Sequence, residues 1–126
     1  MASSAPGPTN LGVAPNVGGL LCYAPCCIGL IFSIVAAIVE KQSRFLRFHA
    51  FQSLLFHAAI FVVSIAVQIF LVVLGMISSG LALIGSLVWL LVGLALLGAY
   101  IFLMVKAYNN EEFEIPTLGA MARNWV

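Results

Sequence analysis

Apolar and polar positions divide this sequence into three long apolar runs separated by short polar segments. The runs cover residues 18–39, 54–77 and 81–105, and none of them contains Lys, Arg, Asp or Glu. A helix of about 20 apolar residues is long enough to cross the hydrocarbon core of a bilayer. The pattern therefore predicts an all-α integral membrane protein with three transmembrane helices, over about residues 18–39, 46–77 and 80–106.

The two ends of the sequence predict no further crossing. Residues 1–17 are rich in Pro, Gly and Asn, which favours a flexible N-terminal arm, and they lack the basic start of a secretory signal. Residues 107–126 contain an acidic run followed by Pro116, which favours a cytoplasmic C-terminal tail. The expected domains are this arm, a three-helix membrane domain over residues 18–106, and the tail.

The few charged residues predict an orientation in the membrane. They make up only 7% of the sequence, against roughly 25% in soluble domains, and the mean hydropathy is +1.18. All five Lys and Arg follow the first or the third apolar run. Because basic residues concentrate on the cytoplasmic side, we expect the N-terminus outside and the C-terminus in the cytoplasm of a multi-pass protein of the bacterial inner (cytoplasmic) membrane. A net charge of +1 gives no reason to expect a nucleic-acid partner.

Small residues mark one face of the first and of the third predicted helix. At 100° per residue, Gly29, Ser33 and Ala37 share a face, as do Gly85 and Gly93. Small side chains let membrane helices approach closely, so these residues are expected at helix–helix contacts. The partners would be neighbouring helices, a second copy of the chain or other integral membrane proteins.

The cysteines carry less information. Cys22 and Cys26 lie on the small-residue face of the first predicted helix and are interpreted as packing residues, while Cys27 points elsewhere. A disulfide or a lipidated cysteine is the alternative. Because no spaced second pair of ligands completes a four-ligand set, no metal site is expected.

A stripe of polar residues runs along the second predicted helix, opposite a fully apolar face. Its members are His49, Gln52, Ser53, His57, Ser64 and Gln68. Polar groups without partners are costly in hydrocarbon, so we expect this stripe to face protein, a ligand or water.

The two histidines of the stripe are too far apart to share one ligand. Eight residues of helix separate His49 from His57 by about 12 Å and 80°. His57 alone is a candidate axial ligand for a tetrapyrrole, chlorophyll or haem, and the alternative is a hydrogen-bonded packing residue. With no catalytic pattern elsewhere in the sequence, we expect no enzyme.

Basic and aromatic residues begin the second predicted helix. Arg44, Arg47, Phe48 and Phe51 are expected at the membrane interface, with the guanidinium groups reaching lipid phosphates and the rings at the acyl boundary. This arrangement predicts an anchor on membrane lipids. A site for an anionic lipid or a partner peptide is the alternative.

Two motifs resemble a family of small bacterial membrane proteins that are similar to the twenty-kilodalton component of the chloroplast Tic import machinery. The first motif matches at Glu40, Phe45, Arg47, Phe48, His49, Ala50, Gln52 and Ser53. The ending matches at Lys106, Ala107, Tyr108, Glu112, Phe113, Pro116 and Gly119. The resemblance covers residues 18–120 and implies three helices, and through the import component it implies a part in protein translocation.

Three hypotheses for function follow. The first is a non-enzymatic accessory or structural subunit that packs within a larger membrane protein complex. The second is a component of protein translocation or insertion, as the resemblance implies. The third is a tetrapyrrole-binding subunit of a photosynthetic or respiratory complex, with His57 as the ligand.

Overall fold

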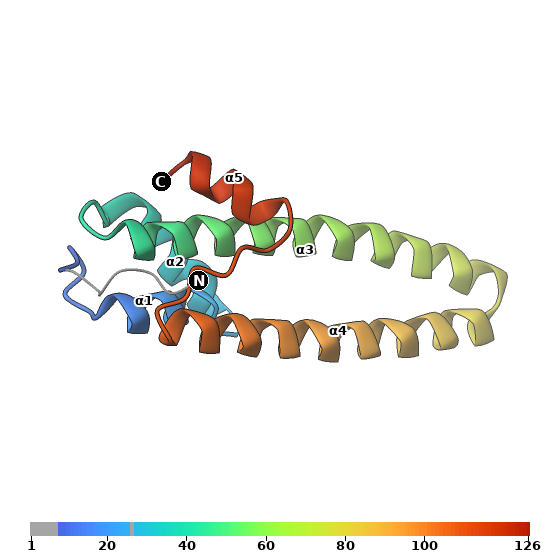
Figure 1. Cartoon of the computed structure of the whole chain (residues 1–126). Coiled ribbons are helices and arrows are strands. Elements are labelled where there is room, and N and C mark those ends of the chain that lie inside the picture. The colour runs from blue at the N-terminus through green and yellow to red at the C-terminus, as the bar shows by residue number, and fades with distance from the viewer. Residues whose placement is uncertain (1–7, 26) are drawn as a thin grey trace.

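The computed structural model describes residues 8–25 and 27–126, and these residues form five helices. In chain order the helices are α1 (Pro15–Cys22), α2 (Cys27–Val39), α3 (Arg44–Ile77), α4 (Ser79–Tyr108) and α5 (Leu118–Asn124). Figure 1 shows α3 and α4 as a long hairpin, with α1, α2 and α5 gathered around the end where α3 begins and α4 ends. The expectation of an all-helical fold with apolar helices long enough for a membrane is confirmed.

The long hairpin contains the two helices of the described residues that are long and apolar enough to cross a membrane. The Ser43 hydroxyl accepts a hydrogen bond from the Leu46 N–H at 3.1 Å and so caps the start of α3. Ser78 alone separates α3 from α4 and caps the start of α4. The two helices therefore turn within one residue, opposite the end where the short helices gather.

The first apolar run does not form the predicted single helix over residues 18–39. It is divided between α1 and α2, which have 8 and 13 residues and are about 12 Å and 20 Å long. The Asn10 N–H donates to the Glu40 carboxylate at 2.8 Å, and the Lys41 N–H donates to the Asn10 side chain at 2.6 Å. This segment thus enters and returns at one end of the molecule, as a re-entrant hairpin.

The re-entrant hairpin corrects two predictions. The structure does not support a third membrane span, because neither short helix reaches the length that a crossing needs. It also does not support termini on opposite sides, because residue 10 and α5 both lie at the end where α3 begins. Of the predicted flexible arm, residues 1–7 lie outside the described residues, and residues 15–17 belong to α1.

The re-entrant hairpin turns at Tyr23 to Pro25, where side chains of the protein form hydrogen bonds with a backbone carbonyl that the turn leaves free. The carbonyl oxygen of Cys22 accepts hydrogen bonds from the Ser33 hydroxyl at 3.1 Å and the Ser53 hydroxyl at 2.6 Å. Gly29 packs so closely on the turn that a Cβ there would lie 2.3 Å from the Ala24 carbonyl oxygen. Non-helical backbone is tolerated at membrane depth when protein groups replace water in this way.

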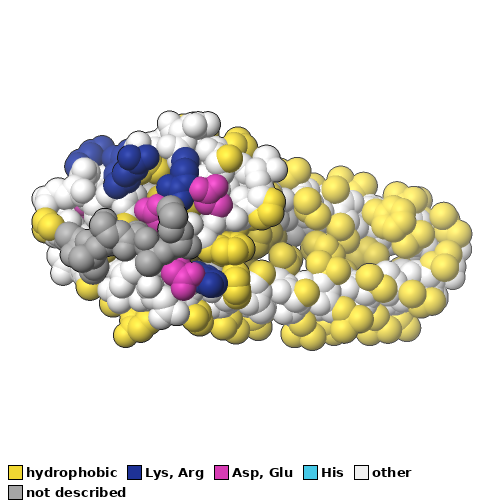
Figure 2. Space-filling view, in the orientation of Figure 1, with side chains coloured by type: hydrophobic (Ala, Val, Ile, Leu, Met, Phe, Trp, Pro, Cys, Tyr) yellow, Lys and Arg dark blue, Asp and Glu magenta, His cyan; other side chains and the backbone are white. Residues whose placement is uncertain are grey.

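The core lies at the end of the molecule that holds the short helices. Its buried members include Cys22, Tyr23, Ala36, Leu46, Ala50, Leu103 and Ala107. Gly18 packs against Leu46 of α3, and Gly19 packs against Ala107 of α4, so α1 fits between the two long helices. Figure 2 shows the charged side chains gathered at this end, while hydrophobic side chains cover the distal half of α3 and α4. We call these two regions the polar end and the distal half.

The C-terminal segment packs against α3, where a tail was predicted. The Arg123 guanidinium lies 4.6 Å above the Phe48 ring and pairs with Glu112 and Glu114. Trp125 packs edge-on against Phe51, with ring centres 5.8 Å apart. Residues 111–126 therefore form part of the folded polar end.

Candidate functional site

Gln52 is the centre of a buried polar network at the polar end. Its side-chain nitrogen donates to the Tyr23 hydroxyl at 2.8 Å and to the Phe113 carbonyl at 2.9 Å. Its side-chain oxygen accepts from the Ile115 N–H at 2.9 Å. Gln52 is fully buried, so one side chain links the re-entrant hairpin, α3 and the C-terminal segment. Buried hydrogen bonds of this kind hold the parts of the fold that they connect in one arrangement.

His49 belongs to this network and lies in the interior. The Tyr23 hydroxyl accepts from Gln52 and lies 3.0 Å from His49 Nδ1, to which its O–H can donate. His49 Nε2 is buried and has no hydrogen-bond partner among the described residues. The rings of Phe45 and Phe48 lie 4.5 Å and 5.3 Å from the His49 ring, and His49 is 1% exposed. Its role here is to hold the hairpin to α3.

The predicted polar stripe is divided between two environments. His49, Gln52 and Ser53 are buried against the hairpin and the C-terminal segment. His57 and Ser64 are half-buried beyond the core, and Gln68 is exposed in the distal half. The first three residues therefore close the fold, and the others are available to something outside it.

The tautomer of His57 follows from its contacts. His57 Nδ1 lies 2.8 Å from the Ser53 carbonyl oxygen and 3.2 Å from the Ser53 hydroxyl. The hydroxyl donates its proton to the Cys22 carbonyl, and a carbonyl cannot donate, so these contacts favour the tautomer with the proton on Nδ1. The Nε2 lone pair is then free to accept a hydrogen bond or to bind a metal centre. Tetrapyrrole binding at His57 stays a prediction.

The structure does not support the predicted lipid anchor as a unit. Phe48 is fully buried beneath Arg123 and cannot contact lipid. The Arg47 guanidinium donates to the carbonyl oxygens of Glu40 at 3.1 Å and Trp125 at 3.3 Å, so it joins parts of the chain. Phe51 is half-buried beside Trp125 and Arg44 is exposed.

The predicted helix-packing residues also have different environments. Gly29 and Ser33 pack within the hairpin turn, and Ala37 lies against the core. Gly85 faces Leu71 of α3, where a Cβ would lie 2.6 Å from that side chain. A Cβ on Gly93, by contrast, would meet no atom within 4 Å. Gly93 is therefore not packed closely against another helix among the described residues.

Glu40 is a structural residue whose role the sequence does not reveal. Its carboxylate accepts hydrogen bonds from the backbone N–H groups of Asn10, Gln42 and Ser43, each between 2.8 and 2.9 Å. Burial alone would raise the pKa of Glu40, but the backbone hydrogen bonds outweigh it and hold the pKa below its usual 4.5. Ionised Glu40 therefore joins the start of the hairpin to the loop before α3.

Replacing Glu40 by Gln is expected to lower the free energy of unfolding by about 1–3 kcal/mol at pH 7, because an amide NH₂ would face a backbone donor. The lowered pKa means that this stabilisation is present above pH 4.5 and is lost as the pH falls through the folded value. The difference in free energy of unfolding between wild type and Glu40→Gln should therefore be smaller at acidic pH. Thermal unfolding in detergent, followed by circular dichroism at pH 7 and pH 3, measures both effects.

Glu111→Gln is the matched control, since Glu111 pairs with the partly exposed Lys106 among the described residues. A smaller loss of stability is expected there. Equal effects of the two substitutions would contradict the role given to Glu40.

Comparison with known proteins places the chain in a family. A model of the magnetosome magnetite crystal formation protein family, MamF/MmsF, matches residues 9–122. The chain belongs to this family. It is also similar to a UPF0132 membrane protein of Methanocaldococcus jannaschii, with 36% identity over 94% of each chain. A UPF0132 membrane protein of Archaeoglobus fulgidus is 33% identical over 88% of this chain and 94% of its own.

These findings correct the resemblance drawn from the two motifs. The matching family is MamF/MmsF, the relatives are archaeal, and none of the matches is to a chloroplast import protein. No solved structure matches the chain. The motif residues themselves meet in space, since Gln52 from the first motif binds Phe113 from the second. The two motifs therefore contact each other within the polar end of this chain.

Proposed function

We propose that the chain is a non-enzymatic structural protein of the cytoplasmic membrane that packs within a larger assembly of integral membrane proteins. The observation that carries this proposal is the contrast between the two halves of the molecule. At the polar end, Tyr23, His49, Gln52 and Ser53 are all engaged in holding the fold together. In the distal half, α3 and α4 contact little but each other.

The distal half offers a surface for partners. Gln68 is exposed on α3, within a stretch of otherwise apolar side chains. An amide without a partner is costly in hydrocarbon, so contact with another protein or a second copy of the chain would stabilise it. The relatives are named membrane proteins, which supports a location in a membrane.

The description of the family refers to the formation of magnetite crystals in magnetosomes. In this chain Glu111 pairs with Lys106, while Glu112 and Glu114 pair with Arg123. The role proposed for this chain is assembly within the membrane.

A photo-crosslinking amino acid at Gln68 is expected to capture protein, either another membrane protein or the chain itself. The matched control is the same amino acid at Phe70, which is 58% exposed and points about 200° around the helix from Gln68. That position should label mainly lipid. Gel electrophoresis and mass spectrometry of irradiated membranes identify the products. Labelling of lipid alone at both positions would contradict the proposal.

A further inference from the structure

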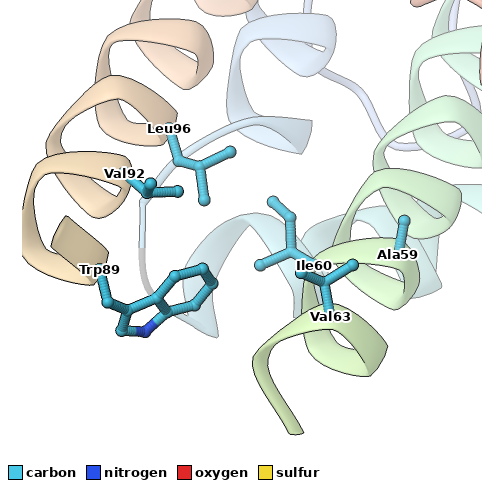
Figure 3. Close-up of a pocket in the computed structure, with 6 residues that line it drawn as sticks. All are labelled: Ala59, Ile60, Val63, Trp89, Val92 and Leu96. Carbon is cyan, nitrogen blue, oxygen red and sulfur yellow. The ribbon is translucent and has the colours of Figure 1, made fainter. Parts of the chain in front are cut away.

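A crevice lies beneath the turn of the re-entrant hairpin, between α3 and α4. Its middle part has a volume of about 200 Å³ and is lined by Ala59, Ile60, Val63, Trp89, Val92 and Leu96. Figure 3 shows the three α3 residues facing the three α4 residues across this space. In Figure 1, α1 and α2 lie along the polar ends of α3 and α4, while α5 lies on the outer side of α3, so the crevice begins where α1 and α2 stop.

Two further pockets adjoin the middle part of the crevice. One, of about 520 Å³, lies beside Leu30 of α2 and shares Ile60 with the middle part. The other, of about 410 Å³, lies under Pro25 at the hairpin turn and shares Leu96. His57 lines both of these pockets. Their volumes are in the range of binding sites for small molecules, and His57 stands where they meet.

His57 gives this apolar crevice a specific polar group. Its Nδ1–H is held by the Ser53 carbonyl, so its Nε2 presents a lone pair that requires a donor. The Tyr100 ring lies 5.3 Å from the His57 ring, and its hydroxyl has no hydrogen-bond partner among the described residues. An acceptor and a hydroxyl thus lie together in a crevice whose lining is otherwise apolar except for Ser64.

The lone pair restricts the kind of molecule that fits. His57 is three residues beyond Leu54, where the apolar run of α3 begins, and so about 4.5 Å along the helix from it. The ester carbonyls and acyl chains of a diacyl phospholipid cannot donate a hydrogen bond. A bound molecule that interacts with Nε2 directly therefore needs an O–H or N–H donor.

We infer that the crevice binds a neutral amphiphile with a hydroxyl head group. The hydroxyl donates to His57 Nε2, and the apolar tail lies between α3 and α4 against Trp89. Long-chain alcohols and quinols share this chemistry. The inference is independent of the assembly role, because it concerns the interior of the α3–α4 hairpin and the assembly role concerns the exposed surface around Gln68.

The test uses the full chain, labelled with ¹⁵N at histidine, in phosphatidylcholine nanodiscs. It is titrated with dodecanol, with dodecyl methyl ether, which has the same tail and no donor, and with a dodecyl hydroquinone. Dodecanol is expected to shift the Nε2 resonance of His57 saturably, and the ether to need about a tenfold higher mole fraction. The Nε2 resonance of the buried His49 is the internal reference and should stay unchanged.

The comparison of the two donors identifies the head group. Tighter binding of the hydroquinone assigns an aromatic head, and tighter binding of dodecanol assigns an alcohol. His57→Phe should remove the difference between dodecanol and the ether, as measured by ligand-induced thermal stabilisation. Ser86→Ala should keep the difference, because the Ser86 hydroxyl donates to Ala82 of its own helix.

Three results would overturn the inference. One is equal affinity for dodecanol and the ether in the wild type. Another is a His57 resonance that no donor shifts, which decides the matter even when His57→Phe does not fold. The third is a visible absorption band of a co-purified tetrapyrrole that depends on His57.

Discussion

A reporter fused to either terminus is expected to show both ends of the chain in the cytoplasm. The re-entrant hairpin returns to the end where it starts, as the hydrogen bonds from Asn10 to Glu40 and to Lys41 show. All five Lys and Arg lie in segments at that same end, and the Ser78 turn at the other end has none. Because basic residues favour the cytoplasmic side, the polar end should face the cytoplasm.

The measurement compares three fusions in a bacterial host, each made with alkaline phosphatase and with green fluorescent protein. Fusions at the N-terminus and the C-terminus should fluoresce and lack phosphatase activity. A phosphatase inserted after Ser78 should be active, because that turn is expected on the outer side. An active phosphatase at the N-terminus would restore three spans and contradict the hairpin.

Replacing Gly29 by Ala is expected to destabilise the protein by about 3 kcal/mol, at the upper end of overpacking effects. A Cβ at Gly29 would lie 2.3 Å from the Ala24 carbonyl oxygen and 2.9 Å from that of Cys22. These are backbone atoms, so a side-chain rotation cannot relieve the clash. The turn would have to open, and the contacts of Tyr23 with Gln52 and His49 would weaken with it.

Gly98→Ala is the matched control, since a Cβ there would meet nothing within 4 Å. Ala is preferred over Gly within a helix, so this change should be neutral or stabilising by up to about 1 kcal/mol. Unfolding by sodium dodecyl sulfate in mixed micelles, followed by circular dichroism, measures both variants. Equal stability of the two variants would show that the hairpin turn is not closely packed.

The long helices could be predicted from the sequence because the length of an apolar run is a direct physical requirement for crossing a bilayer. The same argument was wrong for residues 18–39. That run is long enough, but Pro25 lies within it, and the break becomes favourable only through Ser33 and Ser53, which satisfy the Cys22 carbonyl. Contact with Ser53, which is 31 residues away, is not visible in a local pattern.

The candidate site was predictable in part for a related reason. The polar stripe on α3 predicts that these side chains need partners, and the structure gives hydrogen bonds to three of its members, His49, Gln52 and Ser53. The partners come from the hairpin and the C-terminal segment, which the periodicity of one helix cannot identify. Phe48 and Arg47 were assigned to lipid because the packing of α5 on α3 leaves no clear pattern in the sequence.

The connections of Gln52 have a consequence for the order in which the protein assembles. Gln52 binds Phe113 and Ile115, which are 61 and 63 residues further along the chain. During synthesis the hairpin and the first half of α3 leave the ribosome well before these partners exist. The hydrogen bonds that fix the re-entrant hairpin to the C-terminal segment therefore cannot form until residues 113 to 115 have been synthesised. A chain that stalls before residue 113 would sit in the membrane with an unlocked hairpin, a natural target for quality-control proteases.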